Sequence, residues 1–156
     1  MDVQQSKWNP VNLVFVPSLS QGTDVGCEIA CTDTERADLI SQLSPASLAY
    51  IGDAVYELYV RTRYLLPPKR LSDYHDRVVA QVRAESQAAC LRVLESYLTD
   101  EEREILRRGR NAATGKPRRL SPELYQQATS LETLIGYLYL QNPRRLNELL
   151  EHLNLE

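Results

Sequence analysis

The spacing of apolar residues is helical along most of the chain. From Thr34 onward, apolar positions recur every three or four residues, and no segment alternates convincingly with a period of two. Residues 1–34 lack this period and are interrupted by Pro, Gly and Ser, which are typical of irregular structure. We therefore expect an all-α domain over residues 35–156, preceded by an irregular N-terminal extension over residues 1–34 with at most one short strand or docking segment.

Capping signals divide the helical region into separate segments. Two Ser-Pro pairs, one Asn-Pro pair and one Thr-x-x-Glu capping box each mark the first turn of a helix. The Pro-Pro pair after Leu66 and the glycine at Gly109 each mark a helix end. The predicted helices cover, approximately, residues 34–43, 45–66, 72–97, 100–109, 122–141 and 143–153.

Composition is that of a water-soluble globular domain. Hydrophobic residues make up 43% of the 156 residues and charged residues 25%, and no run of about 18 apolar residues could span a membrane. The first residues, MDVQQSKWNP, do not predict a signal peptide. Three cysteines without the spacing of a disulfide framework favour reduced thiols. We expect a cytoplasmic protein with no membrane partner.

Basic residues concentrate near position 110, although the net charge of the chain is −3. The segment RRGRNAATGKPRR, which we expect to be a loop, contains no acidic residue, and Asn111 with Gly115 suits it to a flexible turn. Such a cationic segment is typical of a nucleic-acid-binding surface, whereas a linker kept soluble by its charge is the alternative. The candidate contacts are Arg107, Arg108, Arg110, Asn111, Lys116, Arg118 and Arg119.

Two strongly apolar helices each carry one acidic residue near the middle. LAYIGDAVYELYV contains Asp53, and TSLETLIGYLYL contains Glu132. Each helix also has a glycine, Gly52 or Gly136, that would let another backbone approach closely. Because burial of an unpaired carboxylate is costly, we expect both acids to be buried with a partner. Two carboxylates from separate helices can converge on a hard divalent cation.

Ordinary structural roles are the alternative for these acids. Asp53 could pair with Arg61 or Arg77, and Glu132 could lie at the rim of its helix. The basic segment favours the cation, because a phosphodiester backbone attracts Arg and Lys and carboxylate-bound Mg²⁺ catalyses its hydrolysis. Glu57, one turn after Asp53, could orient a metal-bound water or pair with Arg61. The combination indicates a nuclease.

Three motifs resemble the ribonuclease III family and together cover about residues 43–153. IGDAVYE resembles the signature helix, with Gly-Asp at its centre, and SLETLIGYLYL resembles the second acidic helix. RRGRNA and the Gly-containing basic stretch after it are similar to Mini-ribonuclease III, the compact bacterial branch without a double-stranded-RNA-binding domain. The resemblance implies a ribonuclease III-type helical bundle with Asp53 and Glu132 as catalytic metal ligands.

The chain departs from the larger ribonuclease III enzymes at two acidic positions. Ala49 and Thr129 stand where those enzymes have Glu and Asp, as in the Mini-type branch that the chain resembles. Fewer charges predict weaker Mg²⁺ binding through more waters, and Thr129 is a candidate to orient such a water. Glu85 stands where the Mini-type pattern has Lys, which leaves the contribution of its helix to RNA binding open.

The resemblance implies a Mg²⁺-dependent endoribonuclease, with Mn²⁺ as a substitute, that cleaves double-stranded RNA and leaves 5′-phosphate ends. It also implies a homodimer with two active sites in one RNA-binding valley, and a role in maturing the large (23S) ribosomal RNA precursor in the bacterial cytoplasm. A catalytically inactive RNA-binding or ribosome-assembly module is the alternative, favoured by the few carboxylates and by Glu85. A helical protein–protein adaptor without RNA is a third interpretation.

Overall fold

The computed structural model describes residues 33–115 and 119–155, and over these residues it contains helices and no strand. The all-α prediction is therefore confirmed for the described part of the chain. Most of the predicted extension lies outside the described residues, so its boundary at residue 34 stays a prediction. The helices are α1 (Asp33–Ser41), α2 (Pro45–Tyr64), α3 (Leu71–Val82), α4 (Ala84–Leu94), the 3-10 turn η2 (Glu95–Tyr97), α5 (Asp100–Ala112), α6 (Pro122–Gln141) and α7 (Pro143–Leu150).

Side-chain caps fix the first turns of four helices where the sequence predicts them, including α7, where Asn142 accepts a hydrogen bond from the Arg145 backbone N–H at 3.1 Å. Ser44 accepts a hydrogen bond from a backbone N–H of α2 at 3.0 Å, and Ser121 does the same for α6 at 3.2 Å. Thr99 and Glu102 form both hydrogen bonds of a capping box at the start of α5. Each bond satisfies a donor that the helix itself leaves unpaired. The predicted starts of α2, α5, α6 and α7 are confirmed.

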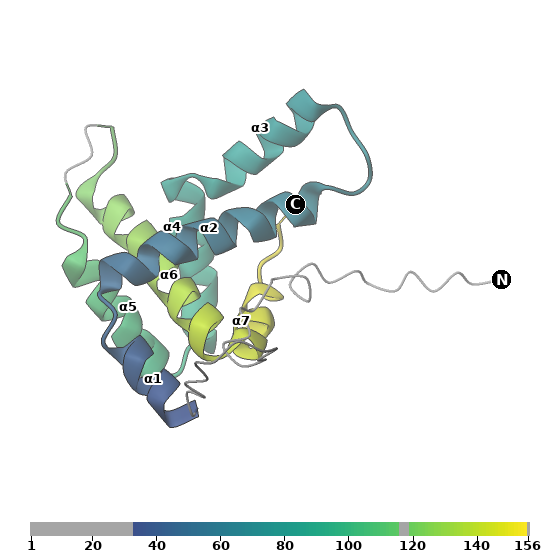
Figure 1. Cartoon of the computed structure of the whole chain (residues 1–156). Helices are drawn as coiled ribbons and strands as arrows, with labels where there is room; N and C mark the ends of the chain where they lie inside the picture. The colour runs from purple at the N-terminus through teal and green to yellow at the C-terminus, as the bar shows by residue number, and fades with distance from the viewer. Residues whose placement is uncertain (1–32, 116–118, 156) are drawn as a thin grey trace, which may run out of the picture.

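Helix α6 is the central element, packed against α2, α4, α5 and α7, and Figure 1 shows α2 crossing it near the middle of the molecule. The crossing depends on two glycines. A Cβ atom on Gly52 would lie 1.8 Å from the carbonyl oxygen of Glu132, and one on Gly136 would lie 2.0 Å from that of Leu48. No side chain fits at either position, so the two backbones touch, as the paired glycines predict.

The hydrophobic core lies between α2, α4, α6 and α7. Tyr56, Leu94, Leu134 and Leu150 are each at most 1% exposed within it. No helix of the described residues is long and apolar enough to cross a bilayer. The core therefore supports α6 from several sides.

The predicted long helix over residues 72–97 is wrong, because the chain breaks at Arg83. Arg83 has extended backbone (φ −68°, ψ 150°), and it separates α3 from α4. The two helices bury different faces: within α3 only Val78 is buried, whereas the α4 residues Ala88, Leu91 and Leu94 all face the core. A straight helix could not place both faces against α2 and α6, so tertiary packing overrides the local helical preference.

Two larger differences at helix ends concern α5 and α7, while α1 and α2 each end two residues before the predicted end, at Ser41 and Tyr64. Helix α5 continues past Gly109 to Ala112, because this glycine serves packing: a Cβ atom there would lie 2.5 Å from the Thr133 hydroxyl. Helix α7 ends at Leu150, about three residues earlier than predicted. Both differences lie within the usual uncertainty of helix termini, but the first moves basic residues from the predicted loop onto α5.

Candidate active site

The α2–α6 crossing brings Asp53 and Glu132 together. Asp53 directly follows Gly52, whose backbone touches the backbone of Glu132. The negative charge of Asp53 is one cause of the raised pKa of the Glu132 carboxyl. The close approach of the two acidic helices is as the sequence predicts, and joint metal binding by the two carboxylates stays a prediction.

The two carboxyls titrate differently. Burial first, and then the charge of Asp53, raises the pKa of Glu132 to about 7, against a hydrogen bond from Gln87 that lowers it. Burial and then the charge of Glu57 raise the pKa of Asp53. The charge of Asp53 therefore disfavours the ionised form of Glu132. Within the described residues no ion pair balances the two carboxylates, which form an unbalanced pair.

Asp53 is exposed, and the expectation that it is buried inside its helix is wrong. Gly52 is the residue that faces α6, and the next position is rotated by about 100° around α2, toward solvent. Glu132 is half-buried in the middle of α6 rather than at the rim of that helix. The partial burial of Glu132 is the largest cause of the rise in its pKa.

The arginines proposed as partners of Asp53 have other contacts. Arg61 donates to the Glu57 carboxylate, with its Nε 2.9 Å from Oε1, so the pairing interpretation of Glu57 is confirmed. Arg77 acts on Tyr64 instead. Within residues 33–115 and 119–155 no ion pair reaches Asp53. Asp53 therefore retains its capacity to bind a cation.

The donor set fits a divalent cation that keeps several water ligands. Across the described residues, no group of three or more His, Cys, Asp or Glu side chains gathers around one point. Two carboxylates suit Mg²⁺, which commonly binds one or two carboxylates and retains waters, and do not suit a closed zinc site. Thr129 is half-buried one turn before Glu132, where its hydroxyl could orient such a water. The two carboxylates could hold the ion.

The first part of the basic segment predicted to be a loop is helical. Arg107, Arg108, Arg110 and Asn111 lie in the last turns of α5, so the prediction that Asn111 belongs to a flexible turn is wrong. The cause is the packing of Gly109 against Ser130 and Thr133 on α6, which extends the helix.

Four of the seven predicted RNA contacts are exposed or half-exposed, and none of these four has an acidic partner at hydrogen-bond distance among the residues that the structure describes. Arg107 is paired with Glu104 at 2.6 Å, whereas Arg110, Asn111 and Arg119 are exposed and Arg108 is half-buried. Lys116 and Arg118 lie outside the described residues. Because Gly109 contacts Thr133, the neighbour of Glu132, the basic end of α5 and the carboxylate pair share the same part of α6.

Sequence reasoning missed one residue of this site. Gln87 of α4 is 2% exposed, and its side chain hydrogen-bonds the Glu132 carboxyl. It lies four and seven positions before Leu91 and Leu94, on the same buried stripe. The signal in the sequence was a polar residue, Gln87, among the apolar residues of the buried face of α4.

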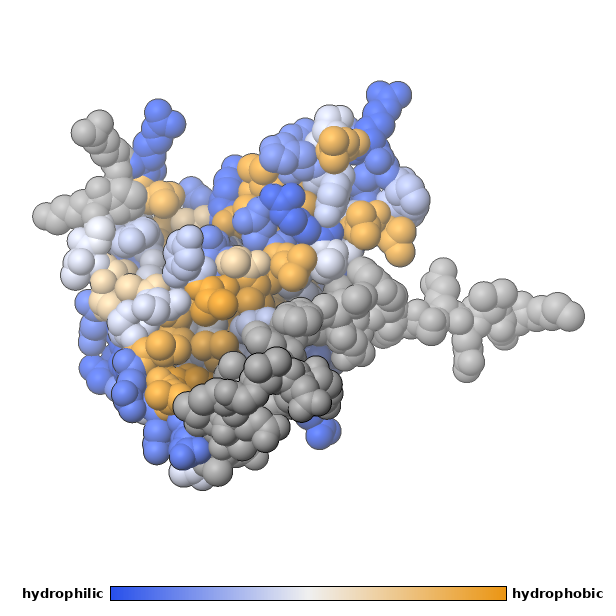
Figure 2. Space-filling view, viewed as in Figure 1, coloured by the Kyte–Doolittle hydropathy of each residue, from blue (hydrophilic) through white to orange (hydrophobic). Residues whose placement is uncertain are grey.

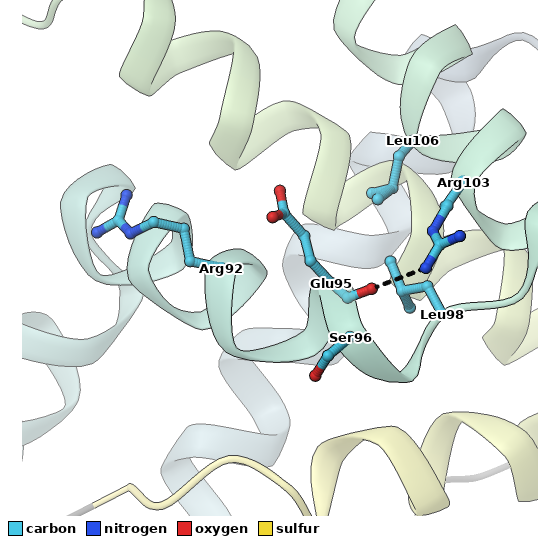
Figure 3. Close-up of a pocket in the computed structure, with 6 residues that line it drawn as sticks. All are labelled: Arg92, Glu95, Ser96, Leu98, Arg103 and Leu106. Atoms are coloured by element: carbon cyan, nitrogen blue, oxygen red, sulfur yellow. Dashed lines mark hydrogen bonds between the residues drawn. The ribbon is translucent and has the colours of Figure 1, made fainter.

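A groove elsewhere on the surface is separate from the carboxylate pair. Figure 3 shows it between α4, η2 and α5, with a volume of about 530 Å³ and the side chain of Arg103 donating to the Glu95 carbonyl at 3.3 Å. Its lining includes none of the predicted catalytic or RNA-binding residues. The carboxylate pair lies elsewhere, with Asp53 exposed and Glu132 half-buried.

Comparison with known proteins identifies a family. The family model described as "Ribonuclease III domain" matches residues 46–143. Mini-ribonuclease 3 of Synechocystis sp. (strain ATCC 27184 / PCC 6803 / Kazusa) is 61% identical over 119 residues, covering 76% of this chain and 83% of the relative. Mini-ribonuclease 3 of Kosmotoga olearia is 45% identical over 119 residues, covering 74% of this chain and 81% of the relative.

A solved structure agrees with the sequence relatives. The crystal structure of protein FN1578 from Fusobacterium nucleatum superimposes with a TM-score of 0.66 at 29% identity, covering 70% of this chain and 92% of that protein. The matched residues contain both carboxylates and the basic end of α5. The chain therefore belongs to the ribonuclease III family, in its Mini-ribonuclease 3 branch, and is an endoribonuclease of that type acting on double-stranded RNA.

Proposed function

We propose that Asp53 and Glu132 together hold a catalytic Mg²⁺, for which Mn²⁺ can substitute, and that the enzyme hydrolyses duplex RNA to leave 5′-phosphate ends. The observation that carries the proposal is the juxtaposition of two carboxylates at the Gly52 crossing, without a basic partner among the described residues. When bound, the ion would activate water and stabilise charge on the departing oxygen.

The remaining residues act on the substrate and on the carboxylates. Arg108, Arg110 and Arg119 present positive charge on the same part of the molecule and would bind the phosphate backbone of the duplex. Thr129 could orient a water beside Glu132. The negative charge of Glu57 raises the pKa of Asp53, and the Glu57 carboxylate accepts a hydrogen bond from Arg61. Glu57 would therefore act on Asp53 electrostatically and would not bind the ion directly.

The unbalanced pair predicts how metal-free stability depends on pH. The folded pKa of Glu132, about 7, exceeds its ordinary value of 4.5, so its contribution to stability is complete below about pH 4.5 and is lost as pH rises through 7. Glu132→Gln removes this titration. In EDTA, the free energy of unfolding of the variant, relative to that of wild type, should therefore rise by about 1–3 kcal/mol between pH 5 and pH 8.

Urea unfolding at the two pH values measures this difference, because other titrating groups are common to both proteins. Addition of Mn²⁺ at pH 8 should stabilise wild type and not Glu132→Gln. Parallel pH dependences in the two proteins would contradict the raised pKa of Glu132 in the folded state.

We also propose that the enzyme is a homodimer. Tyr50 is 87% exposed on α2, three residues before Asp53, and Leu58, Leu65 and Leu66 are 46%, 50% and 56% exposed farther along the chain. Figure 2 shows hydrophobic residues gathered in patches on the face over which α2 runs. Apolar surface of this kind is typical of subunit interfaces. The exposed face of α2 would be the contact between two copies, placing both carboxylate pairs near one substrate channel.

Charge on this face should disrupt the dimer. Tyr50→Lys is expected to shift the protein from dimer to monomer in light-scattering chromatography, because a desolvated ammonium would oppose association. Tyr97→Lys, at a 46% exposed tyrosine on η2, is the matched control and should leave the mass unchanged. A wild-type protein that is monomeric at micromolar concentration would contradict the proposal.

The finer assignment of substrate rests on the family resemblance. We propose that the precursor of the large (23S) ribosomal RNA is the cellular substrate and that cleavage takes place in the bacterial cytoplasm. Incubation of the purified enzyme with transcribed precursor, followed by mapping of the RNA ends, tests the assignment. Discrete cuts in the precursor duplex support it, and a precursor that stays intact while a generic duplex is cut opposes it.

A further inference from the structure

We propose that Gln87 is a positioning residue of the active site, which holds the Glu132 carboxyl beside Asp53 without neutralising it. The inference rests on the proposed role of Glu132 as a metal ligand. It assigns a function to a residue outside the two acidic helices and outside the basic segment.

The contact is made by a buried side chain. Gln87 is 2% exposed on α4, which packs against α6, and its side chain hydrogen-bonds the Glu132 carboxyl. An ionised carboxylate only accepts hydrogen bonds, so the amide nitrogen of Gln87 is the donor in the state that would bind a cation. A buried amide with a fixed backbone is a rigid support for a half-buried acid.

The break between α3 and α4 sets the direction of this amide. Extended backbone at Arg83 starts α4 afresh, and Ser86 bridges the break by donating to the Ala80 carbonyl at 2.6 Å. Gln87 follows immediately, in the first turn of α4. The deviation from a continuous helix therefore places a hydrogen-bond donor against the middle of α6.

Glu132 needs such a support because it has reasons to move. Its side chain has three rotatable bonds and is only half-buried, so an unsupported carboxyl would be free to swing toward solvent. An Arg or Lys at position 87 would also hold the Glu132 carboxyl, but its positive charge would neutralise the carboxylate and compete with the cation. A neutral amide orients the ligand and preserves its charge.

Substitution of Gln87 by Met tests the inference, since Met has similar length and no strong donor. Loss of an outer partner typically costs about 10–100-fold in metal affinity or activity, and we expect that loss in both kcat and Mn²⁺ affinity. Duplex affinity, measured in Ca²⁺ without turnover, should be unchanged, as should KM. Gln87→Asn keeps the amide on a shorter side chain and should fall between wild type and Gln87→Met.

Gln81→Met is the matched control, because Gln81 hydrogen-bonds Tyr64 on the neighbouring helix α3 and has no part in the site. Mn²⁺ titration by electron paramagnetic resonance gives a readout independent of turnover. Wild-type kcat and Mn²⁺ affinity in Gln87→Met, alongside an inactive Glu132→Gln, would overturn the role of Gln87 alone. Equal losses of kcat and Mn²⁺ affinity in Gln81→Met and Gln87→Met would also overturn that role, because they would show that Gln87 contributes only ordinary packing. An active Glu132→Gln would overturn the site assignment and this inference with it.

Discussion

Replacement of Asp53 by Asn is expected to abolish cleavage of duplex RNA while leaving the fold and the binding of duplex intact. The amide keeps the shape of the side chain but removes the charge that would bind the cation. Asp53 is exposed and has no ion pair among the described residues, so the substitution breaks no structural contact in them. The loss in kcat should exceed about 100-fold, the upper range for losing only an outer partner.

The same reasoning applies to Glu132→Gln, which should be equally inactive. Asp38→Asn, at an exposed position of α1 away from the crossing, is the matched control and should retain wild-type cleavage. Unfolding curves and duplex binding in Ca²⁺ separate loss of chemistry from loss of structure. Retention of a tenth or more of wild-type activity by Asp53→Asn would remove it from the proposed ligands.

Removal of the positive charge at the end of α5 is expected to weaken duplex binding and flatten its salt dependence. Arg108, Arg110 and Arg119 should contact phosphates, because the deep and narrow major groove of duplex RNA prevents side chains from reading the bases. Each lost phosphate contact should reduce the magnitude of the log-affinity versus log-salt slope by about one unit. Replacement of all three by Ala should therefore lower affinity most at low salt.

A salt titration of duplex binding measures this effect, in the inactive Asp53→Asn background so that the RNA stays intact. Arg144→Ala removes one positive charge from α7, where the side chain is 92% exposed, and should leave the slope unchanged. Equal slopes for wild type and the triple variant would place the RNA elsewhere, with the surface of α3 as the next candidate.

Local signals were sufficient for most of the architecture. The Ser-Pro pairs and the capping box determine helix starts through contacts within four residues, so they can be read directly from the sequence. The glycines at positions 52 and 136 also predicted correctly that two acidic helices cross closely. Helix caps and the close helix crossing each require a particular backbone geometry that only one or a few residue types allow, so those residues can be recognised in the sequence.

The features that the sequence did not reveal depend on tertiary packing. Each half of residues 72–97 has good helical preference, and only the different faces buried by α3 and α4 require the break at Arg83. Asp53 is exposed because it lies about 100° around the α2 axis from Gly52, the residue that faces α6. The apolar composition of α2 does not reveal which of its faces is exposed. Gln87 could be recognised as a partner of Glu132 only after α4 was placed against α6.

Anomalous diffraction from crystals of the wild-type enzyme containing Mn²⁺ would show whether Asp53 and Glu132 jointly bind a divalent cation. We expect one anomalous peak between the two carboxyls at the Gly52 crossing, and no such peak in crystals of Asp53→Asn grown under the same conditions. A peak bound by other side chains, with none between Asp53 and Glu132 at a Mn²⁺ concentration that supports cleavage, would contradict this expectation.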